Sequence, residues 1–145
     1  MQAWCAARGV RCVVLRVPGI YGPGRLPLER LRRGEPALRA EDSGQGNRIH
    51  VDDLVTACVA ALERPVSGAF NVTDGNPATT TEFLQRTAAL AGLLAPELVA
   101  WADAPGRIGA GMLTCLRESR RVDNRRMRTA LGVEPRYASL DEGIT

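Results

Sequence analysis

The sequence predicts an α/β protein built around part of a doubly wound parallel sheet. Two short runs, residues 12–17 and 69–73, are rich in apolar residues and have the length of buried strands. Two longer segments, residues 52–64 and 79–92, have the apolar spacing and the start signals of helices. Because strands that alternate with helices pair in parallel through crossover connections, these segments predict a parallel sheet with helices packed on it.

The first strand leads into a glycine-rich loop. Residues 2–8 are expected to form a short helix that ends at Gly9, where a left-handed conformation carries no Cβ penalty. We expect the strand over residues 12–17 to be buried on both faces and to end at Pro18, which has no N–H to donate. Residues 18–25 then contain three glycines. Since ligands of open parallel sheets bind outside the carboxyl ends of the strands, this loop is the first candidate site.

The middle of the chain continues the alternation. Residues 26–33 are predicted to form a short helix and residues 35–39 an edge strand. Residues 48–51 form a brief strand that runs directly into a helix, with Asp52 as the N-cap and Pro65 as the stop. The apolar stripe of this helix is expected to face the core and comprises Leu54, Val55, Cys58, Val59 and Leu62.

A second strand and helix follow. The strand over residues 69–73 is closed by a turn at residues 74–77. Thr79 and Glu82 stand three residues apart and predict a capping box at the start of the next helix. The side chains expected to face inward from this helix are Phe83, Leu84, Ala88 and Ala91.

The last third of the chain is less regular. Residues 97–104 lie between two prolines and fit either a strand or a helix. Residues 112–119 predict a helix. A final helix, capped by Asp123 or Asn124, is expected to end at Leu131.

Length and composition describe one globular domain of 145 residues, 45% of them hydrophobic and 24% charged. All 19 basic residues are arginines, so a Schiff-base lysine, a P-loop lysine and a Tyr-x-x-x-Lys pair are excluded within this chain. His50 is the only histidine, and the four cysteines are too widely spaced for a zinc site. We therefore expect no metal site and buried, reduced thiols.

Neither a membrane span nor a signal peptide is predicted. No apolar run approaches the roughly 20 residues that cross a bilayer. The amino terminus, MQAWCAARGVR, lacks a basic segment followed by an apolar one. The sequence therefore favours a cytoplasmic location and no membrane partner.

Three polar residues stand out as candidates for ligand contact. Tyr21 and Arg25 are polar groups on the glycine-rich loop at the end of a strand. Tyr21 could equally pack in the core with its hydroxyl hydrogen-bonded. His50 either lines a substrate cleft or is a structural histidine that hydrogen-bonds a backbone carbonyl, and the structural role is favoured because no nucleophile or metal partner accompanies it.

Two motifs invite a phosphate-binding interpretation. Six arginines lie between Arg117 and Arg128, but no aromatic residue is interleaved and Glu118 and Asp123 dilute the charge. A solvated face is therefore favoured, and nucleic acid is disfavoured as a partner. Residues 106–111, GRIGAG, reverse the spacing of the dinucleotide fingerprint and lack the strand that must precede it, so we interpret them as a flexible loop.

Four stretches carry a resemblance to a known family. They are LRVPGIYGPGR (15–25), NRIHVDDLVTACVAALERP (47–65), GAFNVTDGNPATTTEFL (68–84) and ESRRVDNRRMRTALGVEPRYASLDEGI (118–144). In order and spacing they resemble the carboxyl-terminal half of extended short-chain dehydrogenase/reductases, the NAD-dependent epimerase/dehydratase family.

The resemblance implies a cofactor and a set of contacts. It implies NAD or NADP, with Pro18, Gly19 and Ile20 lying against the nicotinamide. It also implies a small sugar-like or other carbonyl or hydroxyl substrate. The residues expected to contact that substrate are Tyr21, Gly22, Arg25, Arg48 and His50.

The resemblance also implies a Rossmann-like architecture in two parts. Residues 1–25 and 47–92 would form the carboxyl-terminal part of the nucleotide-binding sheet, and residues 26–46 and 93–145 a small mixed α/β substrate-binding lobe. The glycine fingerprint and the Tyr-x-x-x-Lys pair of the family have no counterpart in this sequence. We therefore expect no catalytic residue in this chain and no turnover by the chain alone.

An open sheet edge follows from this interpretation. The strand over residues 12–17 would keep one neighbour, residues 69–73, and present an apolar edge of the kind that proteins normally cover. A partner that carries the nucleotide-binding half, or self-association, would cover it. The alternative is a stand-alone binding module, which would use the Arg117 to Arg128 cluster to bind nucleic acid with an affinity that falls steeply with salt.

Overall fold

The computed structural model describes residues 1–144. Two parallel strand pairs form its centre. Strand β1 (Val13–Arg16) pairs with β6 (Gly68–Asn71), as predicted, with Val13 opposite Gly68. Strand β2 (Gly19–Tyr21) pairs with β5 (Arg48–His50), with Tyr21 opposite His50. The expected α/β class with parallel pairing is therefore confirmed.

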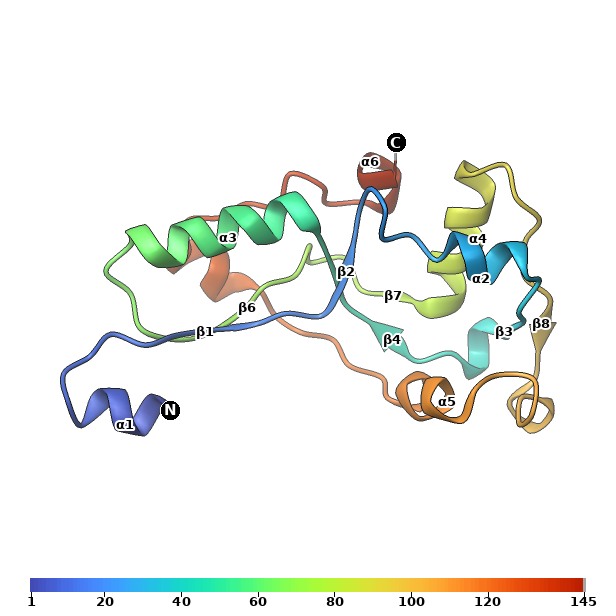
Figure 1. Ribbon diagram of the computed structural model, residues 1–145, viewed down its shortest axis with the longest axis horizontal. Helices are drawn as coiled ribbons and strands as arrows, with labels where there is room; N and C mark the ends of the chain where they lie inside the picture. The colour runs from blue at the N-terminus through green and yellow to red at the C-terminus, as the bar shows by residue number, and fades with distance from the viewer. Residues whose placement is uncertain (145) are drawn as a thin grey trace.

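Strand β2 corrects the prediction of a loop after Pro18. The prolines and glycines of residues 18–25 hid a strand, because only three residues pair and their partners in β5 lie about thirty positions further along the chain. Pro18 separates β1 from β2, and a proline between strands forms no ladder hydrogen bond through its nitrogen. The chain changes direction between β1 and β2 and continues as a second strand (Figure 1).

The largest core lies between these strands and two helical segments. Helix α3 (Val51–Glu63) runs along β1 and β6, and the π-helical turn η3 (Met127–Leu131) packs beside it (Figure 1). The buried residues of this core are Ile49, Ala57, Ala61, Phe70, Val72, Met127, Leu131 and Val133. The final helix expected up to Leu131 is thus a short helical segment that widens into a π-helix.

Helix α3 is rotated relative to its predicted orientation. Its buried residues are Asp53, Ala57 and Ala61, whereas Val55 and Leu62 are 56% and 75% exposed. The helix carries apolar residues on more than one face, and its alanines allow the closest approach to the strands. The larger side chains of the predicted stripe therefore lie mainly on the outer face, with Leu54 half-buried.

The starts of two helices show different capping. His50, and not Asp52, caps α3, because its Nδ1 accepts the Asp52 N–H at 3.2 Å. Helix α4 (Thr80–Leu90) begins with the predicted capping box, in which Thr79 and Glu82 bond each other's backbone N–H groups. Phe83 is half-buried and Ala91 is exposed, so only Leu84 and Ala88 of the four expected inward residues are fully buried.

The other end of the molecule is a small mixed α/β region (Figure 1). Strand β3 (Ala37–Leu38) pairs in parallel with β8 (Leu98–Val99), and β4 (Gln45–Gly46) pairs antiparallel with β7 (Ala78–Thr79). The surrounding helical segments are α2 (Leu28–Arg32), η1 (Ala40–Asp42), η2 (Trp101–Asp103) and α5 (Ala110–Arg117).

Two small cores hold this region together. One contains Leu31, Ala37, Leu84 and Ala88, and the other contains Leu38, Val99, Ala104, Ile108 and Leu116. Helix α4 thus packs with α2 and β3, while η3 packs with α3 and the strands. The division at residues 1–25 and 47–92 against 26–46 and 93–145 stays a prediction.

The two ends of the described chain are short helices. Helix α1 (Gln2–Ala6) lies beside the start of β1, and α6 (Leu140–Ile144) lies near β2 (Figure 1). All four cysteines are free; Cys5 is buried, but Cys58 and Cys115 are exposed, so the expectation of buried thiols is wrong for these two. None of the helices within residues 1–144 is long and apolar enough to cross a membrane.

Strand β1 has one partner within residues 1–144. Its Val13, Val14 and Leu15 are only half-buried, in contrast to the expected burial on both faces. Beside this edge lies an apolar groove of about 380 Å³ between β1 and α3. It is lined by Arg11, Val13, Leu15, Cys58, Ala61 and Leu62. The described part of the chain therefore places no strand on the second side of β1.

Candidate functional site

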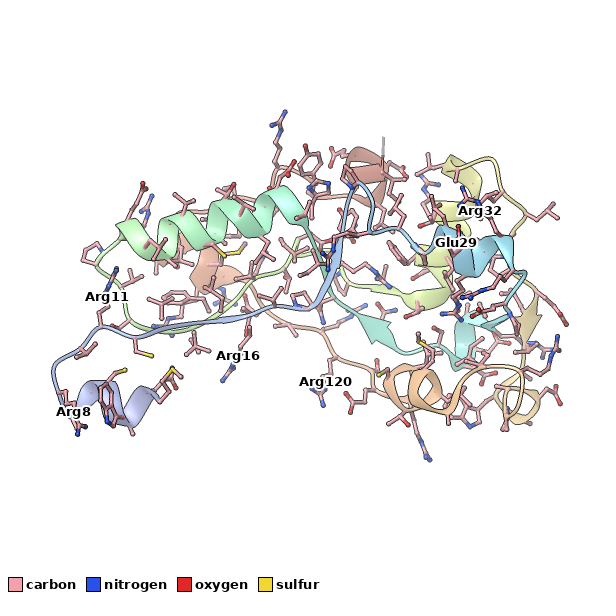
Figure 2. The ribbon with its side chains drawn as sticks, in the orientation of Figure 1. Arg8, Arg11, Arg16, Glu29, Arg32 and Arg120 are labelled. Carbon is pink, nitrogen blue, oxygen red and sulfur yellow. The ribbon has the colours of Figure 1, made fainter. Side chains whose placement is uncertain are left out.

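A hollow of about 600 Å³ lies at the carboxyl ends of β1 and β6. Parallel strands place their carboxyl ends at one edge of a sheet, where ligands of such folds bind. Its lining, named here as the strand-end hollow, is Arg16, Val17, Pro18, Asn47, Asn71, Thr73, Arg120, Arg121, Val122 and Asp123. Within Figure 2, Arg16 and Arg120 project to the same side of the molecule from segments far apart in sequence.

One wall of the hollow is an extended segment held by side-chain amides. Asn47 Nδ2 donates to the Arg120 carbonyl at 2.9 Å, and Asn47 Oδ1 accepts the Val122 N–H at 3.1 Å. Asn71 Nδ2 donates to the Asp123 carbonyl at 2.9 Å. A single asparagine thus bonds this segment much as a neighbouring strand would, which fixes the backbone that carries Arg120 and Arg121.

The lining carries more positive than negative charge. Arg16 and Arg121 have no hydrogen-bond or ion-pair partner for their guanidinium groups within residues 1–144. Arg120 pairs with Glu118 at 2.9 Å. The carboxylate of Asp123 is occupied by Arg125, whose guanidinium lies 2.9 Å away. The hollow therefore favours an anionic group.

Of the residues expected at the cofactor, Pro18 lines the hollow together with its neighbour Val17. Gly19 is exposed beside them and begins β2. Ile20 points elsewhere, since it packs against the core that contains Phe70. The structure thus brings one of the three expected residues into the hollow.

Tyr21, Gly22 and His50 lie together in a buried cluster apart from the hollow. Tyr21 is 1% and His50 2% exposed, and their rings meet edge to face with centroids 5.3 Å apart. Tyr137 covers His50 at 3.8 Å between centroids. Gly22 has a φ of +138°, and a Cβ there would lie 3.0 Å from His50 Nε2, so only glycine fits. This cluster is packed like a core.

The tail over residues 136–144 closes this cluster. The buried carboxylate of Asp53 accepts the N–H groups of Arg136 and Tyr137 at 2.9 and 3.0 Å. The Tyr21 hydroxyl lies 3.4 Å from the carbonyls of Tyr137 and Ser139, and burial raises the pKa of Tyr21. Tyr21 therefore occupies the core alternative foreseen from the sequence.

Arg48 and Arg25 have opposite surroundings. Arg48 is 9% exposed and donates to the carbonyls of Ala78 and Thr79, with its guanidinium 4.3 Å from the centroid of Phe83. Burial lowers the pKa of Arg48, although Asp74 opposes this effect. Arg25 is exposed on the turn after β2. Neither lines the hollow, and their roles toward a substrate stay predictions.

Sequence reasoning missed most of the polar lining. Arg16 is the one charged residue in the apolar run of β1, which was a usable signal. Asn47, Asn71 and Arg120 lie in three separate stretches, and no spacing links them, because the chain brings them together only through the crossover of α3 and the return of residues 118–124. Within residues 1–144, no group of three or more potential metal ligands occurs.

Comparison with known proteins gives the family of this architecture. No protein-family model matches the chain. A curated relative, a 3-diazoavenalumate denitrifying reductase from a Streptomyces species, is 35% identical over 150 residues, which cover 99% of this chain and 49% of the reductase. The solved structure of a human epimerase family protein with NADPH has a TM-score of 0.75 at 26% identity. The match covers 93% of this chain and 47% of the human protein. The chain has the fold of one half of an extended short-chain dehydrogenase/reductase.

Two further solved structures agree with this assignment. A functionally unknown conserved protein from Silicibacter pomeroyi has a TM-score of 0.82 at 30% identity, over 99% of this chain and 50% of that protein. UDP-glucose 4-epimerase from Thermus thermophilus, in complex with NAD, has a TM-score of 0.70 at 26% identity, over 98% and 47% of the two chains. The chain therefore spans about half the length of the proteins it matches, which is consistent with the expected carboxyl-terminal half.

Proposed function

We propose that this chain forms the substrate-binding side of an NAD(P)-dependent reductase, epimerase or dehydratase. The observation that carries the proposal is the strand-end hollow, which lies where ligands of open parallel sheets bind. Its relatives are a reductase and epimerases, two of them solved with NADPH or NAD. The substrate is a small molecule bound beside the cofactor.

The residues of the hollow fit a nicotinamide ring. Val17 and Pro18 offer an apolar wall for one face of the ring, and the hollow is within the range of about 300–1,000 Å³ typical of small-molecule sites. Gly19 leaves space beside them, since a Cβ there would meet its nearest neighbour at 3.7 Å. When bound, the cofactor supplies hydride transfer, and this chain orients the reacting partners.

The proton relay must come from outside this chain. The family's Tyr-x-x-x-Lys pair requires a lysine, and the sequence has none. The buried Tyr21 is engaged with backbone carbonyls of the tail. We therefore expect the isolated chain to bind ligands without turning them over.

A reconstitution experiment tests this proposal. The chain is mixed with the separately expressed amino-terminal half of the Streptomyces reductase, and NADPH binding is followed by fluorescence and its oxidation by absorbance with 3-diazoavenalumate. We expect neither half to oxidise NADPH alone and the mixture to do so. Should the halves fail to associate, the same halves joined in one polypeptide give the measurement.

A matched pair of variants locates the cofactor. Val17→Trp fills the hollow, and Val17 is 40% exposed, so the fold should tolerate the change. Leu94→Trp places the same side chain at a residue that is 90% exposed and outside the hollow. We expect only Val17→Trp to abolish turnover. Turnover by this chain alone, or equal activity of the two variants, contradicts the proposal.

The proposal includes a cytoplasmic location and a partner half. Four free thiols suit a reducing compartment, where nicotinamide cofactors also act. The open edge of β1 and the adjoining apolar groove provide the surface on which a nucleotide-binding half would pack. The nucleic-acid alternative has little support, because Arg120, Arg125 and Arg128 each form an ion pair with a nearby carboxylate.

A further inference from the structure

The arginines of the strand-end hollow form a distinct group within it. Arg16 is the last residue of β1, and Arg120 and Arg121 lie on the extended wall of the same hollow. Figure 2 shows Arg16 and Arg120 projecting to the same side. Among the carboxylates of residues 1–144, only Asp123 lines the hollow, and Arg125 already binds it through both its backbone N–H and its guanidinium.

The guanidinium groups of Arg16 and Arg121 differ from those of Arg126 and Arg128. Arg126 donates to the carbonyls of Ser67 and Ala69 and covers the ring of Phe70, and Arg128 pairs with Glu134. Those side chains therefore already have partners within the fold. Arg16 and Arg121 have none within residues 1–144, although they line the largest hollow described above. Two unpaired cations at a concave surface favour a bound anion.

The planar shape of the guanidinium groups indicates which class of anion they bind. A guanidinium donates two parallel hydrogen bonds to a carboxylate or a phosphate, and such charge-assisted bonds are about twice as strong as neutral ones. The wall that carries Arg120 and Arg121 is already fixed by Asn47 and Asn71, so its backbone need not reorganise. The geometry therefore suits an oxyanion group on a small molecule.

We propose that Arg16, Arg120 and Arg121 form an oxyanion-binding subsite that selects a substrate with a carboxylate or phosphate group. This inference rests on the proposed function and narrows its substrate class to anionic small molecules. Arg120 contributes less than the others, because Glu118 competes for it. Asn47 acts as a positioning residue, because its hydrogen bonds to the backbone of Arg120 and Val122 hold the segment that carries Arg120 and Arg121.

Binding to the intact chain tests the subsite without any turnover. Benzoate, phenyl phosphate and the neutral benzamide are titrated into ¹⁵N-labelled chain at low ionic strength. We expect either anion to shift the amide signals of Arg16, Arg121 and Val122, with benzamide at least tenfold weaker. The tighter of the two anions identifies the substrate group. Equal binding of benzamide and the anions overturns the proposal, as does tighter binding of NADP⁺ than of phenyl phosphate at these residues, which would assign the subsite to the cofactor.

Matched charge variants separate a subsite from general attraction. Arg16→Gln and Arg121→Gln should each weaken the anion about 3- to 10-fold, and Arg121→Lys should weaken it less, because lysine keeps the charge without the fork. Arg32→Gln removes the same charge on helix α2, away from the hollow, where Arg32 pairs with Glu29 at 2.6 Å (Figure 2). We expect that control to bind normally. An equal loss in Arg32→Gln would show that net charge alone attracts the anion.

A second measurement tests the subsite if the NMR spectra are too poor to interpret. Arginine-selective labelling by phenylglyoxal, read by mass spectrometry, should be slowed at Arg16 and Arg121 by the bound anion and unchanged by benzamide. Labelling that is independent of the anion overturns the proposal. Neither readout needs the amino-terminal half. If reconstitution succeeds but no anion binds here, only the subsite is contradicted. If the anion binds here but reconstitution gives no turnover, only the proposed function is contradicted.

Discussion

Among single residues, Asp74 has an unusual electrostatic environment. Burial raises the pKa of its carboxyl group to about 6, although the Asn76 N–H and the nearby Arg48 oppose the shift. The folded protein therefore binds the Asp74 proton more tightly than the unfolded chain, whose pKa is near 3.8. Stability contributed by this proton is complete below about pH 4 and is lost as the pH rises through about 6.

Asp74→Asn should remove this pH dependence. An asparagine Oδ1 can still accept the Asn76 N–H, and it carries no charge to desolvate. We expect the variant to be more stable than the natural chain by about 1 kcal/mol above pH 6, a value reduced for partial hydration, and equal to it near pH 4. Thermal melts between pH 4 and 7.5 measure the difference. A gap that does not change with pH would contradict this interpretation.

Two glycines in helices should respond oppositely to alanine. In α6, a Cβ on Gly143 would lie 2.6 Å from Tyr21 Cε2 and 3.0 Å from His50 Cδ2. In α5, a Cβ on Gly111 meets nothing within 4 Å. Gly143→Ala should therefore loosen α6 and lower the melting temperature, whereas Gly111→Ala should stabilise the chain by about 0.5–1 kcal/mol. Hydrogen exchange over residues 137–144 reports the first effect, and equal melting temperatures would show that α6 does not pack as described.

Single residues were also the hardest features to predict. His50 is buried, and within residues 1–144 its ring accepts the Asp52 N–H and bonds no carbonyl, while its role toward a substrate stays a prediction. The polar lining of the hollow could not be predicted, because Asn47 and Arg120 are 73 positions apart and share no motif. Their proximity depends on the tertiary path of the chain.

Among the elements, strand β1 shows the consequence of pairing on one side. The carbonyls of Cys12 and Arg16 accept hydrogen bonds from Gly68 and Val72 in the direction of β6. Because successive residues of a strand point their backbone groups to alternate sides, those of Val13 and Leu15 face the open edge. The register of the pair thus defines which amides lack a partner strand.

Hydrogen exchange should reveal this alternation in the isolated chain. The amides of Val13 and Leu15 are expected to exchange at least tenfold faster than those of Val14 and Arg16, which face β6. NMR-detected exchange at neutral pH resolves the four residues. Uniformly slow exchange from Val13 to Leu15 would mean that the edge is already covered.

Elements whose sequence signal lies within a few neighbouring residues were predicted correctly, and elements that depend on distant partners were not. The parallel pairing of β1 and β6 and the capping box of α4 were read correctly, since a valine-rich run and a Thr-x-x-Glu spacing are local features. Strand β2 and the orientation of α3 were misread. Pairing of β2 depends on β5, and α3 has apolar residues on several faces, so only the packed partner decides which face is buried.

For the whole molecule, the open edge and the apolar groove predict association. Leu62 is 75% exposed and lines the groove, with the half-buried Val13 and Leu15 beside it. Leaving several such side chains without cover removes a large share of the roughly 5–15 kcal/mol that stabilises a domain. The isolated chain should therefore self-associate or require the partner half.

Leu62→Lys should reduce self-association without unfolding the chain. The substitution adds a charge to the groove at an exposed position, while Leu94→Lys adds the same charge at a residue that is 90% exposed and away from it. Sedimentation velocity over a range of concentrations should show a smaller assembly only for Leu62→Lys. A natural chain that sediments as a monomer at every concentration and melts cooperatively would contradict the prediction.

The amide clamp of Asn47 has a thermodynamic consequence for recognition. Its two hydrogen bonds fix residues 120–122 as the protein folds, and ordering a backbone residue costs about 1–2 kcal/mol of conformational entropy. Because this wall is already ordered before a ligand binds, binding loses little conformational entropy in ordering it. Calorimetry of Asn47→Ala should accordingly show a similar enthalpy and a more unfavourable entropy of anion binding, which would make rigidity, more than added contacts, the source of affinity at this wall.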